Sequence, residues 1–436
     1  MYTRRVYEMA SLNTKPDEVP SDAWALYTAA LQEEKSGHLS EAKEKYEKAV
    51  EIFPRFEIAW LNLAMVYQDL GDSTKPIEIS KEALKHVPHS SNLWSNLGTF
   101  YAKNKMHFMA KEALQKAVEF DPFNYSAALN LSTLLRLLKE FQEAEKVICA
   151  ILDKPVDESL YPRIKGTISE LWAQLGLVRG QMGKNEEVRS ACEKALEIDS
   201  TNRTANELLT RVQDWEKVNK LYELGVELYD QQEYSRAIEV YNEVLSINPS
   251  HMYARINIAS ALVNLKQYEE AEKRLRSILE EDDSSHIMWI NLGKALVGLD
   301  NDEEAETAFK RCLEIQPDYA NAWYQLACVY DRQDRLSDSE DALRKTVEHN
   351  PDHYRAWSDL GVTLLQLGRN SEAEGPLRKA TQYGPDDIKS WVNLGLYYTT
   401  QNRCEDAKEA MEAARRIDPD DRHLRQLIAM WNQSCA

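Results

Sequence analysis

Hydrophobic and small residues recur along this chain of 436 residues at a fixed interval of 34 positions. The phrases WLNLAMVY and WSNLGTFY begin 34 residues apart, and WINLGKALVG and WVNLGLYYTT repeat the pattern further along the chain. If each unit starts three residues before the tryptophan position, eleven units begin at Ala23, Glu57, Ser91, Tyr125, Ser169, Val218, Met252, His286, Ala320, Tyr354 and Ile388. A fixed period of this length predicts stacked copies of one supersecondary unit rather than separate globular domains.

Each unit carries two hydrophobic stripes with helical spacing. We number the places of a unit from its first residue. Places 4, 7, 8 and 11 lie on one face of a first helix, and places 20, 24 and 27 lie on one face of a second. In the unit 286–319 these residues are Trp289, Leu292, Gly293 and Leu296, then Ala305, Phe309 and Cys312. Place 8 is small in every unit and place 20 is alanine in eight, which allows the two helices to approach closely. Proline at place 32 in eight units predicts the end of the second helix.

This pattern resembles the tetratricopeptide repeat, a helix–turn–helix unit of 34 residues, over residues 23–421. The resemblance implies an all-α fold, a right-handed α-solenoid of about eleven helical hairpins with a C-terminal capping helix. It also implies that the first helices line the inner, concave wall of the superhelix.

Breaks in the period divide the chain further. The predicted order is an N-terminal arm (1–22), four repeats (23–158), a loop insertion (159–168), a fifth repeat (169–202), an extra connecting helix (203–217), six repeats (218–421) and a capping helix (422–436). The loop is predicted because Pro155 precedes the extra residues and Pro162 lies within them. The connecting helix separates arrays of five and six repeats, and this join is the expected place for flexing.

The charge and cysteine content narrow the class of protein. Acidic residues outnumber basic ones by 72 to 53, and a net charge of −19 disfavours nucleic-acid binding. No secretory signal is evident, and no run approaches the roughly 18 apolar residues of a membrane span. The six cysteines form no C-x-x-C pair, which favours free thiols in a reducing compartment and a cytoplasmic location.

No arrangement of residues favours catalysis, a cofactor or a metal. His349 and His353 have ligand-like spacing, but they straddle the proline between two repeats and no third ligand is evident. Once the repeats, arm and cap are subtracted, no residues remain for a catalytic domain. The chain is therefore predicted not to be an enzyme.

The candidate binding residues are the asparagines at place 6 of the first helix. They are Asn62, Asn96, Asn130, Asn257, Asn291 and Asn393; Gln174, Gln325 and Asp359 are near substitutes, and Thr28 and Glu223 are exceptions. An asparagine offers both a donor and an acceptor, so a ladder of them can pair with the backbone of an extended peptide. The array is similar in this respect to the peptide-binding superhelix of O-linked N-acetylglucosamine transferase, without a transferase domain. The alternative is that these amides only bond neighbouring helices.

The predicted function is a scaffold or adaptor that binds a protein or peptide segment in its concave groove. The alternatives are a structural subunit of a large multiprotein assembly and a regulatory subunit of a separate enzyme. Expected partners are proteins or peptides, with no nucleic acid and no membrane insertion, and self-association is left open.

Overall fold

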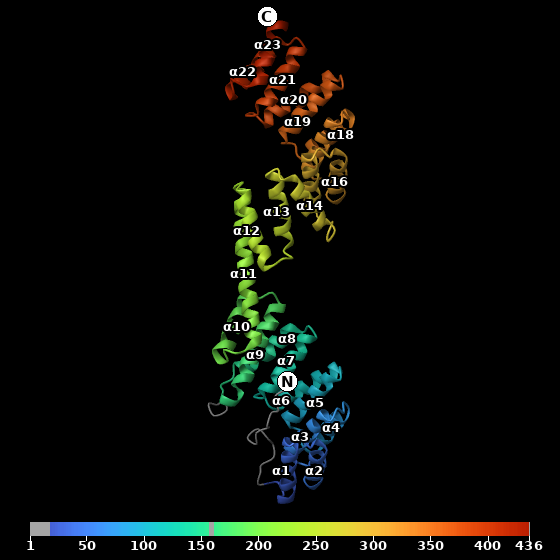
Figure 1. Ribbon diagram of the computed structural model, residues 1–436, viewed down its shortest axis with the longest axis vertical. Helices are drawn as coiled ribbons and strands as arrows, with labels where there is room; N and C mark the ends of the chain where they lie inside the picture. Colours follow the sequence, from blue (N-terminus) through green and yellow to red (C-terminus); the bar gives the residue numbers. More distant parts are fainter. Residues whose placement is uncertain (1–17, 157–160, 436) are drawn as a thin grey trace. The chain divides into compact units, whose positions relative to one another are not determined.

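The computed structural model describes residues 18–156 and 161–435, and these residues contain 23 α-helices and no strand (Figure 1). In chain order the helices are α1 (Ser21–Lys35), α2 (Leu39–Ile52), α3 (Glu57–Asp69), α4 (Lys75–His86), α5 (Ser91–Lys103), α6 (His107–Phe120), α7 (Tyr125–Leu137), α8 (Phe141–Leu152), α9 (Tyr161–Gln181), α10 (Asn185–Ile198), α11 (Arg203–Asp230), α12 (Tyr234–Ile247), α13 (Met252–Asn264), α14 (Tyr268–Leu279), α15 (His286–Gly298), α16 (Asp302–Ile315), α17 (Ala320–Arg332), α18 (Leu336–His349), α19 (Tyr354–Gln366), α20 (Asn370–Tyr383), α21 (Ile388–Thr400), α22 (Cys404–Ile417) and α23 (Arg422–Ser434). The predicted all-α helical-repeat fold is confirmed.

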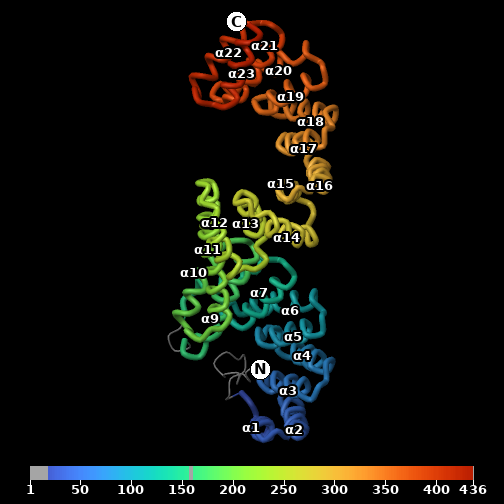
Figure 2. Tube along the Cα trace, turned by 45° about the horizontal axis from the view of Figure 1, so that its top comes forward, coloured from blue at the N-terminus to red at the C-terminus, as the bar shows by residue number. Residues whose placement is uncertain are grey.

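The helices are organised as hairpins within two compact units, residues 1–216 and 217–436. Within each unit a second helix packs against its own first helix and against the first helix of the next hairpin (Figure 2). Successive first helices also contact each other directly, as α5 does α7, α13 does α15 and α19 does α21. The first helices therefore crowd together on one side of each array, which we call the inner wall. Along the part of the chain that the structure describes, no helix is both long and apolar enough to cross a membrane.

The two helices of a hairpin meet where place 8 lies against the side chain at place 24. A Cβ atom added to Gly293 would lie 2.4 Å from the ring of Phe309, and one added to Gly225 would lie 2.5 Å from the ring of Tyr241. Both rings are fully buried. Glycine at place 8 thus leaves room for the large aromatic side chain in the second helix of these two hairpins.

The turn between the two helices has the same backbone conformation in every hairpin. Place 15 has a positive φ, with glycine there in four units and another residue in seven: Lys105, Lys139, Gln232, Lys266, Asp300, Asp334 and Asn402. The next backbone N–H then bonds a carbonyl five residues earlier, as Gln267 does with Leu262 at 2.9 Å. This left-handed residue ends the first helix sharply, and the second helix starts two residues later, or four after Gly71.

The repeated tryptophans pack in or against the core, Trp60 buried and the others half-buried, and they also hold the preceding turn. In six units the indole N–H donates to the carbonyl six residues earlier, at 2.7–2.9 Å: Trp60 to Pro54, Trp94 to Pro88, Trp289 to Asp283, Trp323 to Pro317, Trp357 to Pro351 and Trp391 to Pro385. The tryptophan therefore fixes the junction between consecutive repeats as well as filling space between helices.

The predicted loop insertion at 159–168 is wrong for the residues that the structure describes. Helix α9 begins at Tyr161, so residues 161–168 extend the first helix of the fifth repeat, and Ile168 is buried. Pro162 stands in the first turn of this helix, where its missing N–H removes no helical hydrogen bond. Residues 157–160, and 1–17 of the predicted arm, lie outside the described residues.

The predicted connecting helix at 203–217 is part of one continuous helix. Residues 203–217 form the first part of α11, which continues through the first helix of the sixth repeat to Asp230. The boundary between the two compact units falls inside this helix.

Helix α23 covers the exposed end of the last hairpin. Leu424 and Leu427 are buried, and Leu427 lies 2.8 Å from the position that a Cβ on Gly395 would take. A disulfide joins Cys404 to Cys435, with Cα atoms 5.6 Å apart. The expectation of six free thiols is therefore wrong for these two cysteines, because the cap helix folds back and brings residues 31 positions apart together.

Replacing Gly293 by Ala should destabilise α15 and α16 by about 1–3 kcal/mol, because the new methyl group overlaps the Phe309 ring. Hydrogen exchange in these helices measures the loss. Gly166→Ala is the matched control, because this helical glycine has no atom within 4 Å of an added Cβ. The control should be neutral or stabilising by about 1 kcal/mol, and equal losses in both variants would contradict the close-contact explanation.

Replacing Cys435 by Ser should loosen the cap, since closing a loop of this length is worth about 3–4 kcal/mol. Hydrogen exchange should speed up in α22 and α23 and stay unchanged in α3, because repeats couple mainly to their neighbours. The control is Cys149→Ser, which removes a free thiol in α8. Uniform acceleration along the whole chain would argue against a local cap.

Candidate functional site

All six candidate asparagines lie on first helices, at the junctions between consecutive hairpins. Five of them donate a hydrogen bond from Nδ2 to a hydroxyl of the preceding repeat: Asn62 to Tyr27 and Tyr46, Asn130 to Thr99, Asn257 to Tyr222 and Tyr241, Asn291 to Ser260, and Asn393 to Ser358. Asn96 lies at the same place on α5. The amides of these five asparagines therefore link consecutive repeats by hydrogen bonds along the inner wall.

The asparagines differ in how much of the side chain remains accessible. Asn291 is only 8% exposed, whereas Asn257 and Asn393 are half-buried. An amide carries a carbonyl acceptor in addition to its two donors, and the contacts above use only the donors. The carbonyl oxygens of Asn257 and Asn393 accept no hydrogen bond within the described residues. Peptide binding by these residues stays a prediction, and their contacts with neighbouring helices coexist with it.

A polar hollow of about 350 Å³ opens on the inner wall of the second unit, lined by Tyr324, Arg355, Ser358, Asp359, Asp387 and Lys389. These residues come from α17, α19 and the start of α21. Asp359 is its centre, because its carboxylate accepts from the Tyr324 hydroxyl at 2.9 Å and from the Lys389 ammonium at 3.1 Å. Arg355 forms no ion pair with any described carboxylate, so its guanidinium can bind a carboxylate or carbonyl group of a ligand.

Burial and the charge of Asp359 raise the pKa values of two side chains at this hollow, Tyr324 and Cys328. Burial, and then the Asp359 carboxylate, raise the pKa of the Tyr324 hydroxyl. The same two causes raise the pKa of the Cys328 thiol to about 11. Both groups are therefore neutral at physiological pH and act as hydrogen-bonding groups rather than nucleophiles.

His353, one of the two histidines with ligand-like spacing, has a structural role beside this hollow. Its Nδ1 accepts from the backbone N–H of Ala356 at 3.1 Å, which caps α19, and burial lowers its pKa. Among the residues that the structure describes, no three His, Cys, Asp or Glu side chains gather as a metal site would require.

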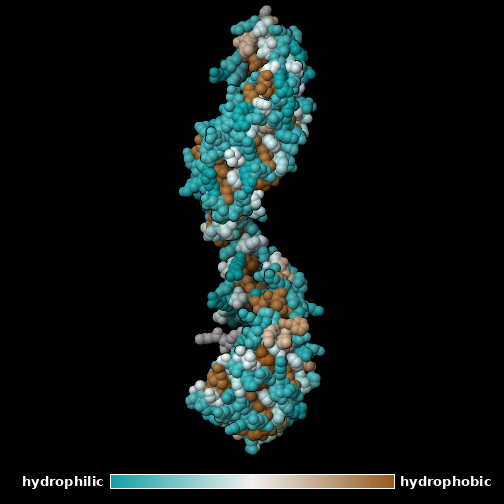
Figure 3. All heavy atoms as spheres, turned by 90° about the vertical axis from the view of Figure 1, so that its right-hand side faces the viewer, coloured by the Kyte–Doolittle hydropathy of each residue, from teal (hydrophilic) through white to brown (hydrophobic). Residues whose placement is uncertain are grey.

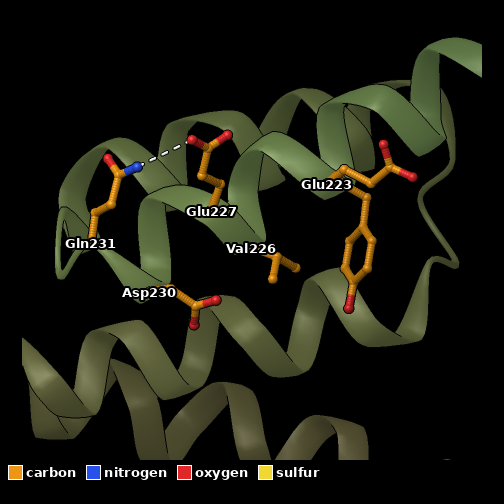
Figure 4. Close-up of a pocket in the computed structure, with 6 residues that line it drawn as sticks. Glu223, Val226, Glu227, Asp230 and Gln231 are labelled. Atoms are coloured by element: carbon orange, nitrogen blue, oxygen red, sulfur yellow. Dashed lines mark hydrogen bonds between the residues drawn. The ribbon is translucent and has the colours of Figure 1, made fainter.

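A second hollow, of about 610 Å³, lies on the C-terminal half of α11 (Figure 4). It is lined by Tyr222, Glu223, Val226, Glu227, Asp230 and Gln231. Its wall is mostly apolar and three carboxylates stand around it. The sequence carries one signal of this hollow, because place 6 changes here from asparagine to Glu223.

The stacked hairpins, the inner wall and the cap helix define a helical-repeat scaffold. Models of the tetratricopeptide repeat match residues 91–124 and 169–202, and the chain is a tetratricopeptide repeat protein. The model of the cilia and flagella-associated protein 70 C-terminal domain matches residues 217–430, nearly the whole second unit.

Similar proteins include the bovine (Bos taurus) BBSome complex member BBS4, which is 26% identical over 270 residues, 61% of this chain and 45% of that protein. The mouse (Mus musculus) tetratricopeptide repeat protein 21A is 24% identical over 219 residues, 49% of this chain and 16% of that protein. This chain thus spans less than half the length of either relative. Among solved structures, the crystal structure of the hetero-tetramer Cut9-Hcn1 of the APC/C aligns with a TM-score of 0.42 and 14% identity, over 94% of this chain and 96% of that one.

Alkylation of Cys328 should report on the polar hollow. With a pKa of about 11 the thiol should react slowly at pH 8 and faster as the pH approaches 11, because only the thiolate attacks. Asp359→Asn removes a negative charge that disfavours the thiolate, so the rise in rate should shift to lower pH. Mass spectrometry of the Cys328 peptide after iodoacetamide treatment measures this. Rapid alkylation at pH 8 in the unaltered protein would contradict the assignment.

Proposed function

We propose that this protein is a non-enzymatic scaffold whose second unit binds an extended segment of a partner protein along its inner wall. The observation that carries the proposal is the placement of the two hollows. Both open on residues of first helices and their junctions, beside asparagines whose carbonyl oxygens accept no hydrogen bond. In the proposed complex, one extended segment contacts both hollows.

The chemistry of the wall suits an extended backbone with a few anchoring side chains. The carbonyl oxygens of Asn257 and Asn393 would accept peptide N–H groups, while their N–H groups stay bonded to the preceding repeat. Tyr253 is 69% exposed and Ile287 is 36% exposed, both at place 2 of their units, and they supply apolar contact area. Arg355 supplies donors for a carbonyl or carboxylate group.

A second candidate function is that of a structural subunit of a large assembly. One relative is named a member of the BBSome complex. In the first unit, Phe108 on α6 is 75% exposed and Leu137 on α7 is 63% exposed, more than most large apolar side chains. Hydrophobic residues on the face shown in Figure 3 form separate patches among hydrophilic ones.

The double variant Asn257→Ala/Asn393→Ala should weaken binding of a partner segment about tenfold or more, because two acceptors are lost at about 0.5–1.5 kcal/mol each. Proteins that co-purify with the intact chain supply the probes, as short overlapping peptides on an array. Fluorescence anisotropy with the strongest peptide then gives the affinity.

Asn291→Ala is the matched control. This residue is 8% exposed and bonds Ser260 at 2.6 Å, so its loss should lower stability and leave the affinity of folded protein unchanged. If the double variant also loses only stability, the amides are structural and do not bind the partner.

A further inference from the structure

The C-terminal half of α11 carries a hollow on the inner wall of the second unit in which half-buried apolar side chains lie among exposed carboxylates. Tyr222 and Val226 supply the apolar wall of the hollow of about 610 Å³, which is open to solvent. The wall continues into the asparagine ladder, because the Tyr222 hydroxyl accepts from Asn257 at 3.3 Å. The hollow has the size to take the stem of a long side chain.

The carboxylates around this hollow lack cationic partners. Glu223, Glu227 and Asp230 are exposed, and none forms an ion pair with a described residue. The Glu227 carboxylate accepts a hydrogen bond from the Gln231 side chain at 3.1 Å (Figure 4). Three uncompensated negative charges around an apolar hollow favour a ligand that carries positive charge.

Three glutamates on second helices of the same unit are arranged differently. Glutamates on second helices pair with an arginine of the next repeat, at 2.6–2.9 Å: Glu306 with Arg335, Glu340 with Arg369, and Glu374 with Arg403. Those charges hold consecutive hairpins together. The three carboxylates on α11 have no such partner, so their charge is available to a ligand.

An aromatic surface adjoins the hollow. The ring centroid of Tyr222 lies 5.0 Å from that of His251, and His251 lies 6.5 Å from Tyr253, which is 69% exposed. The exposed face of the Tyr253 ring can attract a guanidinium or ammonium group. The apolar hollow, the carboxylates and the ring together match arginine or lysine, whose stem is apolar and whose head is charged.

We infer that the hollow on α11 binds an arginine- or lysine-containing segment of a partner protein, with a side-chain stem against Tyr222 and Val226 and its charge beside Glu223, Glu227 and Asp230. The inference rests on the proposed function and adds the chemistry of the bound segment. It also fixes where along the wall the basic part of that segment lies. The charge of this hollow excludes polyphosphate ligands.

The test uses the full chain and two fluorescent peptides, one containing Arg-Leu-Arg in a glycine–serine context and one with both arginines replaced by glutamate. The basic peptide should bind and the acidic one should not, and binding should weaken as salt is raised. Glu223→Gln/Glu227→Gln should weaken the basic peptide about threefold to thirtyfold, because two exposed charge contacts are lost while side-chain shape is kept. Val226→Lys should abolish binding by filling the hollow with a cation.

The matched control is Glu239→Gln/Glu243→Gln. These two glutamates are exposed on α12, have the same spacing of four residues, and belong to the same hairpin. The control should leave the affinity unchanged. Equal weakening by both double variants would show that net charge alone attracts the peptide, and would overturn the inference.

Further outcomes separate this inference from its rivals and from the proposed function. Displacement of the peptide by equimolar spermine would overturn the inference, because a cation without an apolar stem would then suffice. Self-association of the chain that is lost in Glu223→Gln/Glu227→Gln would place a second copy in the hollow and would also overturn it. If co-purified peptides still depend on Asn257 and Asn393 but not on Glu223 and Glu227, the inference fails while the proposed function stands.

Discussion

The close approach of two helices at place 8 is the constraint on which the rest of this structure depends. In the hairpins with Gly293 and Gly225 at that place, the ring of Phe309 or Tyr241 lies directly on the backbone of the first helix and is fully buried. A hairpin built this way still leaves apolar surface on both sides, so it needs a neighbour. The same need explains α23, whose Leu427 covers Gly395 where the array ends.

Stacking of the hairpins creates the surface that the proposed function uses. Because first helices contact each other across consecutive repeats, their polar side chains meet at regular junctions on the inner wall. There Asn257 and Asn393 bond the preceding repeat through their N–H groups, and their carbonyl oxygens accept no hydrogen bond from a described residue. One side chain can thus serve both the fold and recognition, and the two uses need not compete.

The helices were predictable because their signals are local. Spacing of apolar residues, a small residue at place 8 and a proline at place 32 determine each hairpin within 34 residues. The prediction is wrong at 161–168, which is helical. Pro162 suggests a loop, but proline is also favoured in the first turn of a helix. The left-handed turn was hard to foresee where Lys105 or Asp334 replaces glycine, because the conformation is imposed by the packing of both helices.

Features that depend on distant parts of the chain were the least predictable. The sequence near Cys404 does not predict its disulfide with Cys435. The two Cα atoms lie 5.6 Å apart because of the path of the cap helix. The asparagine ladder was visible in the sequence, but its hydroxyl partners in the preceding repeat, such as Tyr222 and Ser358, were not. The hollow on α11 has one local sign, Glu223, and its apolar wall becomes apparent only once the helix is folded.

The most direct test of the central claim is hydrogen exchange of the intact chain, alone and saturated with a co-purified partner. If the inner wall binds the partner, protection should appear in the first helices of the second unit, namely α13, α15, α17, α19 and α21, and along the C-terminal half of α11. The second helices α14, α16 and α18 should exchange as before. Protection confined to those second helices, or to the first unit around α6 and α7, would contradict the account and favour a subunit held in an assembly by its outer faces.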